Sequence, residues 1–127
     1  MIYLDTSAFL KAVWAEPEST ALLRAIGDQP TVSSALLAVE ARRSTIRVDA
    51  TQLPRTDLLL GEVTQVDLTD AVLESAGRLP DPLLRTLDAI HLATALLLRD
   101  ELDVLLTYDT RLAAAAKSHR IPTAAPV

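Results

Sequence analysis

Short apolar runs alternate along this chain with longer segments that have helical spacing. The short runs predict strands at 2–4, 31–33, 63–68 and 104–107, with a last edge strand at 121–123. The longer segments predict helices at 7–14, 20–26, 35–48, 56–62, 71–79, 83–98 and 110–119. Strands separated by helices form βαβ units. The pattern therefore predicts an α/β fold in which a mostly parallel sheet of four to five short strands carries helices on both faces.

Small and polar residues mark where several of these helices begin and end. The run Asp5-Thr6-Ser7 directly follows the first strand and is typical of a helix start. Gly27 ends the second helix, and Ser33 or Ser34 is expected to cap the long third helix. The chain is therefore expected to pass from strand to helix through short turns.

Length and composition limit what this protein can be. With 127 residues and no repeat or linker, we expect a single domain spanning 1–127. Half of the residues are hydrophobic and mean hydropathy is +0.26, which leaves more apolar surface than one small core hides, so we expect a homodimer or a protein partner. The absence of cysteine excludes a disulfide scaffold, a thiol nucleophile and a cysteine-bound zinc site. No signal-peptide pattern or membrane-spanning apolar stretch is present, so we expect a cytoplasmic protein.

Four acidic residues lie beside or within apolar runs. Asp5 and Asp109 directly follow predicted strands, and Glu40 and Asp88 lie on predicted helices, where each shares a face with leucines. In open parallel sheets, sites form outside the carboxyl ends of the strands, and this rule places Asp5 and Asp109 at that edge. Carboxylates are costly to bury without a positive partner. We therefore predict that the four acids converge on a divalent cation.

Each acid also has an ordinary structural interpretation. Asp5 and Asp109 occupy positions typical of helix N-caps. Glu40 can form an ion pair with Arg43, and Asp88 can be an exposed residue on an amphipathic helix. The coincidence of all four acids at one sheet edge favours the metal site.

The basic residues are nearly all arginine. The net charge of −5 argues against a passive nucleic-acid coat but does not exclude an enzyme that acts on nucleic acid through bound metals. Lys11 and Lys117 are the only lysines among 12 basic residues, and arginine is the better side chain for bidentate contact with phosphate. Arg42, Arg43 and Arg111 lie close in sequence to the acids and are candidates for RNA-phosphate contacts. The alternative interpretation is a solvated helix face with local ion pairs.

Neither histidine is predicted to bind metal. His91 follows Asp88 by three residues, but an oxygen-rich site binds hard cations without it, so we expect a hydrogen-bonded histidine near the helix surface. His119 lies near a helix end and is expected to be exposed. The four aromatic residues are too few for a base-stacking platform and are expected mainly in the core.

Several motifs together resemble the PIN-domain family. The resemblance rests on the N-terminal Ile-Tyr-Leu-Asp-Thr-Ser, the Ser33-Ser34 lead into the helix bearing Glu40, the segment 87–95 and the segment Leu-Thr-Tyr-Asp at 106–109. The length and the Asp-Ala-x-His-Leu-Ala-Thr-Ala run are similar to the VapC-type toxin ribonucleases of toxin–antitoxin pairs. The resemblance covers essentially the whole chain. One departure is Leu112, which stands where such proteins often have an aromatic residue.

The resemblance implies a metal-dependent endoribonuclease that is usually homodimeric and is neutralised by a cognate VapB-like antitoxin protein. By position, it implies that the catalytic, metal-binding acids are Asp5, Glu40, Asp88 and Asp109, with Mg²⁺ or Mn²⁺ as the cofactor. It implies Thr6, Ser7 and Thr107 as supporting polar residues. Of the four acids, the fourth varies most across such proteins.

An oxygen-only ligand set favours hard cations, and the mechanism that fits is hydrolysis of RNA phosphodiester bonds by a metal-activated water. Two other classes stay open. A catalytically silent protein-binding module keeps the fold without the activity. A phosphoryl-transfer α/β domain also places acids at strand ends, but a phosphatase of the Asp-x-Asp type needs an acid where Ser7 stands. A receiver domain needs a lysine after a late strand, and neither lysine lies there.

Overall fold

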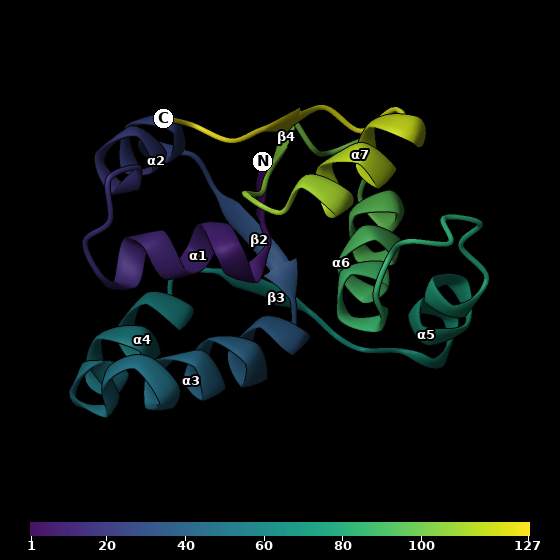
Figure 1. The fold of residues 1–127 in the computed structure, drawn as a ribbon. Helices are drawn as coiled ribbons and strands as arrows, with labels where there is room; N and C mark the ends of the chain where they lie inside the picture. The colour runs from purple at the N-terminus through teal and green to yellow at the C-terminus, as the bar shows by residue number, and fades with distance from the viewer.

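Five short parallel strands form the centre of the structure, a computed structural model that describes residues 1–127 (Figure 1). The strands are β1 (Ile2–Leu4), β2 (Thr31–Ser34), β3 (Thr64–Val66), β4 (Val104–Leu106) and β5 (Thr123–Ala124). Their order in the sheet is β3-β2-β1-β4-β5, and every neighbouring pair is parallel. The chain builds outward from β1 on one side and then returns to the other, so the strand order reverses between β1 and β4. This point is where open α/β sheets form their sites.

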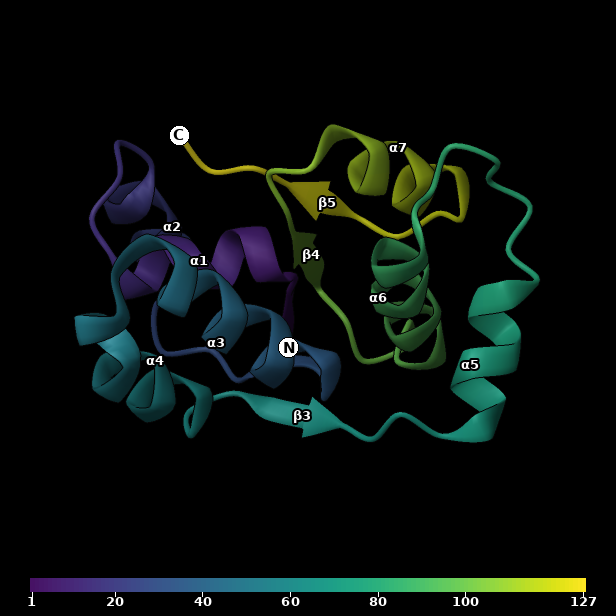
Figure 2. The same ribbon diagram turned by 60° about the horizontal axis from the view of Figure 1, so that its bottom comes forward.

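Helices cover both faces of the sheet, which confirms the predicted α/β class (Figures 1 and 2). The helices on one side are α1 (Thr6–Val13), α2 (Ser19–Ile26), α3 (Leu36–Asp49) and α4 (Leu53–Leu60). Those on the other side are α5 (Asp70–Gly77), α6 (Thr86–Leu97) and α7 (Thr110–Ser118), and α5 packs mainly against α6.

The two faces follow from the alternation of side chains along the strands. In β1, Ile2 and Leu4 pack with Phe9 in one core, which includes residues of α1 to α4. Tyr3 points the other way and packs with Leu92 and other residues of α6 and α7 in the second core. The central strand is therefore buried on both faces, as its continuous apolar sequence indicates.

Most predicted helix boundaries agree with the structure. Gly27 ends α2 with a positive φ of 55°. The N-cap of α3 is Ala35 rather than the expected Ser33 or Ser34, although Ser34 Oγ accepts a hydrogen bond from Leu36 N. A 3₁₀ turn η1 (Ala50–Gln52) leads directly into α4, so this helix covers 53–60 rather than the predicted 56–62. Pro54 is compatible with this arrangement because it lies in the first turn, where its missing N–H is not needed.

Two further elements differ from the sequence prediction. Helix α6 begins at Thr86, not at 83, so Leu84 lies in the preceding loop and Asp88 falls in the first helical turn. Asp88 therefore lies at the end of α6 that faces the carboxyl ends of the strands. Strand β5 covers Thr123–Ala124 rather than 121–123, and it pairs with β4 at Leu105 and Leu106.

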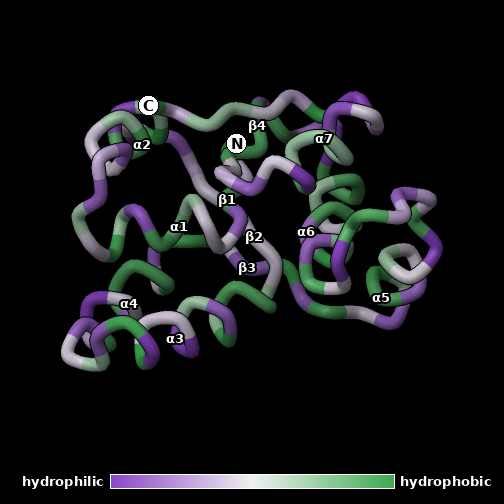
Figure 3. Tube along the Cα trace, in the orientation of Figure 1, coloured by the Kyte–Doolittle hydropathy of each residue, from purple (hydrophilic) through white to green (hydrophobic).

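Hydrophobic residues lie along β4 and along much of α6 and other helices, whereas β2 and β3 are more polar (Figure 3). Several large apolar side chains nevertheless stay exposed, including Val39 on α3, Leu58 on α4 and Leu83, which is 77% exposed in the loop before α6. This matches the excess of apolar residues in the composition. No helix has both the length and the apolar character needed to cross a bilayer.

Candidate functional site

The four predicted acids lie at the carboxyl edge of the sheet, where its strand order reverses. Asp5 is the first residue after β1, and Asp109 is the third residue after β4. Glu40 lies in the second turn of α3, the helix that follows β2, and Asp88 lies in the first turn of α6. The two strand-end acids and the two helix acids thus come from four separate segments of the chain.

Asp5 is held rigidly at the centre of this edge. Its side chain is only 3% exposed. Oδ1 accepts hydrogen bonds from Ser7 Oγ at 2.7 Å and Ala8 N at 2.9 Å, and Oδ2 accepts one from Thr107 Oγ1 at 2.5 Å. Burial raises the pKa of Asp5 above its ordinary value, although these hydrogen bonds act in the opposite direction. Thr107 Oγ1 also accepts a hydrogen bond from Asp109 N at 3.0 Å, so one hydroxyl links the two strand-end acids.

Glu40 is held from two sides through a single oxygen. Its Oε1 accepts a hydrogen bond from Thr6 Oγ1 at 2.7 Å and lies 2.8 Å from His91 Nε2. Burial alone would raise the pKa of Glu40, but the hydrogen bonds from His91 and Thr6 outweigh it and lower the pKa. Glu40 is therefore an ionised carboxylate at neutral pH.

Asp88 has fewer stabilising partners than the other three acids. It receives no hydrogen bond, and its closest cationic group is Arg85, whose Nε lies 4.0 Å from Oδ2. Burial, followed by the charges of Asp109 and Asp5, raises the pKa of Asp88. Asp109 Oδ1 accepts a hydrogen bond from Leu112 N, while Oδ2 lies 3.8 Å from Arg85 Nη2. Three acids are thus electrostatically coupled, and a 70% exposed arginine is the only cation beside two of them.

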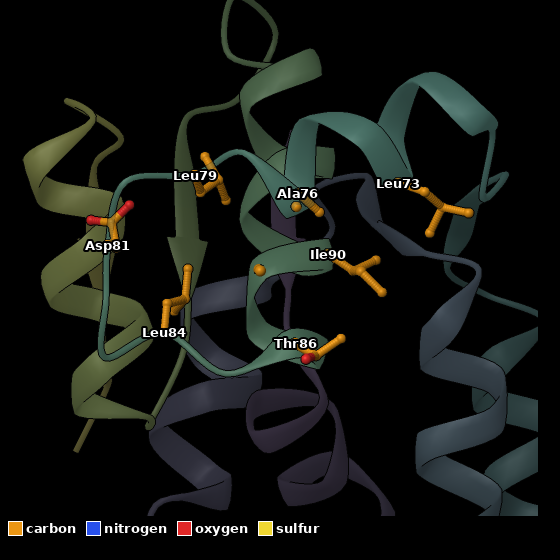
Figure 4. A pocket seen from close by; sticks show the side chains of 9 residues that line it. Leu73, Ala76, Leu79, Asp81, Leu84, Thr86 and Ile90 are labelled. Carbon is orange, nitrogen blue, oxygen red and sulfur yellow. The ribbon is translucent and has the colours of Figure 1, made fainter.

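A groove opens at Glu40 and Asp88. It has a volume of about 620 Å³, and its other lining residues are Leu84, Arg85, Thr86 and Leu87. A separate pocket of about 310 Å³ lies between α5 and α6, with Leu73, Ala76 and Ile90 in its wall (Figure 4). None of the four acids lines that pocket. The groove is therefore the concavity that belongs to the acidic site.

The donor set suits a hard cation, although the acids do not form a closed cage. No group of three or more histidine, aspartate or glutamate side chains is arranged so that it could hold a metal ion by itself. Mg²⁺ does not need such a cage, because it keeps several waters and commonly binds through one or two carboxylates together with substrate phosphate. Burial, and then the charges of Asp109 and Asp5, raise the pKa of Asp88, and Asp88 and Glu40 both line the groove, so these two carboxylates are the ones that could bind a divalent cation there together with waters.

The structure also decides between the alternative interpretations of single residues. Asp5 and Asp109 are N-caps, of α1 and α7 respectively, so the structural interpretation is correct for both and coexists with their place at the sheet edge. The alternative interpretation of Glu40, an ion pair with Arg43, is wrong, because its carboxylate is hydrogen-bonded to Thr6 and His91.

The basic candidates are distributed differently from the acids. Arg42 forms an ion pair with Asp57 at 2.9 Å, with both side chains about half exposed. Arg43 is exposed, and Arg111 lines a second groove beside Leu83 rather than the acidic one. Only Arg85 lies between two of the acids. Arg85 was not among the residues predicted from the sequence, although its position three residues before Asp88 is a usable signal.

The two histidines differ from expectation in their burial. His91 is hydrogen-bonded as predicted, but it is 1% exposed and lies inside the protein between Tyr3 and Glu40. His119 is not exposed, because its Nε2 lies 2.9 Å from Asp81 Oδ2 and the side chain is half-buried. Nothing in the local sequence around either residue indicates these long-range partners.

Comparison with known proteins gives consistent matches across nearly the whole chain. The PIN domain family model matches residues 2–118. The chain is 41% identical over 126 residues to "Ribonuclease VapC46" of Mycobacterium tuberculosis, covering 98% of this chain and 97% of that protein. It is 37% identical over 131 residues to "Ribonuclease VapC35" of the same species, covering 99% and 97%.

Solved structures share the fold. A toxin–antitoxin complex from Klebsiella pneumoniae superposes with a TM-score of 0.76 at 22% identity, covering 100% of this chain and 98% of that chain. Mycobacterium tuberculosis VapC20, described as a sarcin-ricin loop cleaving toxin, superposes with a TM-score of 0.74 at 15% identity, covering 91% and 95%. The family resemblance of the motifs is confirmed, and this chain belongs to the PIN domain family.

Proposed function

We propose that this chain is a metal-dependent endoribonuclease that hydrolyses RNA phosphodiester bonds and acts as the toxin of a toxin–antitoxin pair. The observation that carries the proposal is the gathering of Asp5, Asp88 and Asp109 at one sheet edge, where burial, and then the charges of Asp109 and Asp5, raise the pKa of Asp88. Relatives that are 36–41% identical over nearly the full chain are named ribonucleases, which supports the same activity.

The four acids and three hydroxyl residues have distinct roles in this proposal. We assign metal binding and catalysis to the acids at the edge, Asp5, Glu40, Asp88 and Asp109. A bound Mg²⁺ or Mn²⁺ supplies an activated water and offsets the charge that develops on the phosphate. Thr6, Ser7 and Thr107 orient the carboxylates, because each donates a hydrogen bond to Glu40 or Asp5.

Arginines around the groove are proposed to hold the RNA backbone. Arg85 is placed best, since it lies at the groove and its guanidinium is exposed. Arg42, Arg43 and Arg111 are more distant candidates for phosphate contacts along the RNA. Arg42 can leave its exposed pair with Asp57 at little cost, because such surface pairs contribute about 0–1 kcal/mol.

We further propose a VapB-like antitoxin as the protein partner and a homodimer as the assembly. The exposed apolar side chains of α3, α4 and the loop before α6 supply surface for such contacts. Residues 1–127 are proposed to act as one nuclease domain, which is supported by the pairing of strands from both ends of the chain in one sheet. The site of action is proposed to be the cytoplasm, where the RNA substrates are.

Cleavage of total RNA by the purified protein tests this function. We expect cleavage with Mn²⁺ or Mg²⁺, none with a chelator, and a loss of at least about a hundredfold in Asp88→Asn. Asp100→Asn is the control, because Asp100 is an exposed acid far from the groove and its replacement leaves cleavage unchanged. Cleavage that persists with a chelator, or in Asp88→Asn, contradicts the metal mechanism. A folded protein that binds Mn²⁺ but cleaves no RNA points instead to the silent binding module.

A further inference from the structure

A buried histidine connects the central strand to the acidic site. His91 lies on α6, and its Nδ1 is 2.8 Å from the hydroxyl of Tyr3 on β1. Its Nε2 is 2.8 Å from Glu40 Oε1 on α3 and 3.3 Å from Thr6 Oγ1 on α1. Helices α3 and α6 pack on opposite faces of the sheet, so His91 links the two helix layers at the edge where the acids lie.

The hydrogen-bond chemistry fixes the direction of each contact. An ionised Glu40 carboxylate can only accept, so His91 Nε2 carries the proton and donates it. In the neutral ring Nδ1 then accepts, and the Tyr3 hydroxyl donates. Burial raises the pKa of Tyr3, so the phenol keeps the proton that this arrangement needs. The ring is also held by an edge-to-face contact with Tyr3, with ring centroids 5.8 Å apart.

We infer that His91 is a positioning residue that orients the Glu40 carboxylate for metal binding: protein donors occupy Oε1, and Oε2 is left without one and would be free to bind a cation. This inference rests on the proposed function. Oε1 receives hydrogen bonds from both His91 and Thr6, whereas Oε2 receives none from the protein. A glutamate side chain that is already held in one orientation loses less conformational freedom when it binds a ligand.

The magnitude follows from the general behaviour of groups that orient metal ligands. Loss of a hydrogen bond to a ligand typically lowers metal affinity by about 10- to 100-fold. Tyr3 acts one step further away, because it touches only the ring. We therefore expect Tyr3→Phe to weaken Mn²⁺ binding less than loss of the His91 donor does.

Two amide substitutions of His91 test its hydrogen bond to Glu40 separately from its other contacts. The amide nitrogen of His91→Gln reaches about the position of imidazole Nε2 and can still donate to Glu40. The shorter side chain of His91→Asn reaches only about the position of Nδ1, so it keeps a partner for Tyr3 and loses Glu40. The two variants place similar polar groups in the same buried site, and they form a matched pair.

Calorimetric titration of the full chain with Mn²⁺, without RNA, gives the readout. We expect His91→Gln to bind within about threefold of the parent and His91→Asn to bind about 10- to 100-fold more weakly. In a Glu40→Gln background, His91→Asn should change the affinity by less than about threefold, because the histidine acts through Glu40. A merely structural histidine instead lowers the affinity equally in both backgrounds, together with the melting temperature of the metal-free protein.

The outcomes distinguish this inference from the proposed function. If the parent cleaves RNA with Mn²⁺ while His91→Asn binds Mn²⁺ like the parent, only the positioning role is overturned. If the parent neither binds Mn²⁺ nor cleaves RNA, the proposed function and this inference fall together. Should His91→Asn not fold, Thr6→Val removes the other donor to Oε1, and unchanged Mn²⁺ affinity in that variant also overturns the inference.

Discussion

Replacement of Asp88 by asparagine should stabilise the metal-free protein while it abolishes the response to metal. Asp88 is half-buried, receives no hydrogen bond and has a pKa raised by burial and by Asp109 and Asp5. Its ionised form is therefore destabilised in the folded protein at neutral pH. Asparagine has nearly the same shape without the charge, so the repulsion disappears and little packing changes.

The geometry gives the size of the effect. One guanidinium, that of Arg85, lies 4.0 Å from Asp88 and 3.8 Å from Asp109. Two carboxylates bridged in this way lie within about 10 Å, where two unit charges repel by about 0.4 kcal/mol in water and about 1.7 kcal/mol at an effective dielectric constant of about 20. The lost attraction to exposed Arg85 is below about 1 kcal/mol. We expect a net gain of up to about 1 kcal/mol at low ionic strength, which corresponds to up to about 4 °C for a chain of this length.

Thermal unfolding with a chelator, and then with Mn²⁺, measures both parts of this prediction. At a Mn²⁺ concentration about a hundred times Kd, the parent should gain about 2.7 kcal/mol, or about 10 °C. Asp88→Asn should start from a higher melting temperature and gain almost nothing. Asp100→Asn removes the same charge from an exposed position. Its free energy of unfolding should stay within about 0.5 kcal/mol of the parent value, and it should keep the full Mn²⁺ response.

The pH dependence has a definite sign. The folded protein binds the Asp88 proton more tightly than the unfolded chain, where the pKa has its ordinary value of 3.8. This group therefore favours folding most at low pH, and its contribution is lost as pH rises from about 3.8 through the raised pKa. Asp88→Asn should flatten that part of the profile. The reasoning is refuted if Asp88→Asn is no more stable than Asp100→Asn at pH 7 and low salt.

Three other substitutions test neighbouring features. Arg85→Gln removes the only cation beside Asp88 and should raise Mn²⁺ affinity several-fold while it weakens RNA binding; a fall in Mn²⁺ affinity by calorimetry contradicts this. Thr107→Val leaves Oδ2 of buried Asp5 without its donor and should cost about 1.5–3 kcal/mol in urea unfolding, whereas a cost below about 0.5 kcal/mol shows that this hydrogen bond matters little. Leu92→Ala opens a cavity in the core between the sheet and α6 and should cost about 2–5 kcal/mol by the same assay.

The sequence alone was sufficient to predict the architecture and the acids that the sheet brings to one edge. A short apolar run such as Ile2–Leu4 is typical of a strand buried on both faces, and the alternation of such runs with helical segments indicates a parallel sheet covered by helices and hence the α/β class. The rule that sites form at the carboxyl ends of strands then places Asp5 and Asp109 at one edge. The ends of strands and the starts of helices in this chain are marked by residues close together in sequence, so they can be recognised without a structure.

Tertiary structure alone decided which groups satisfy the acids. Glu40 meets His91, which is 51 residues away, rather than its helical neighbour Arg43, because α3 and α6 converge at the sheet edge. Asp88 lies in the first turn of α6 because the helix begins at Thr86. The sequence predicts an earlier start because its apolar residues already begin at Leu83. Hydrogen bonds of this kind depend on how whole helices pack, and packing is set by contacts distant in sequence. The sequence therefore determined the charges at this edge, and the packing of the helices determined the partner and the pKa of each charge.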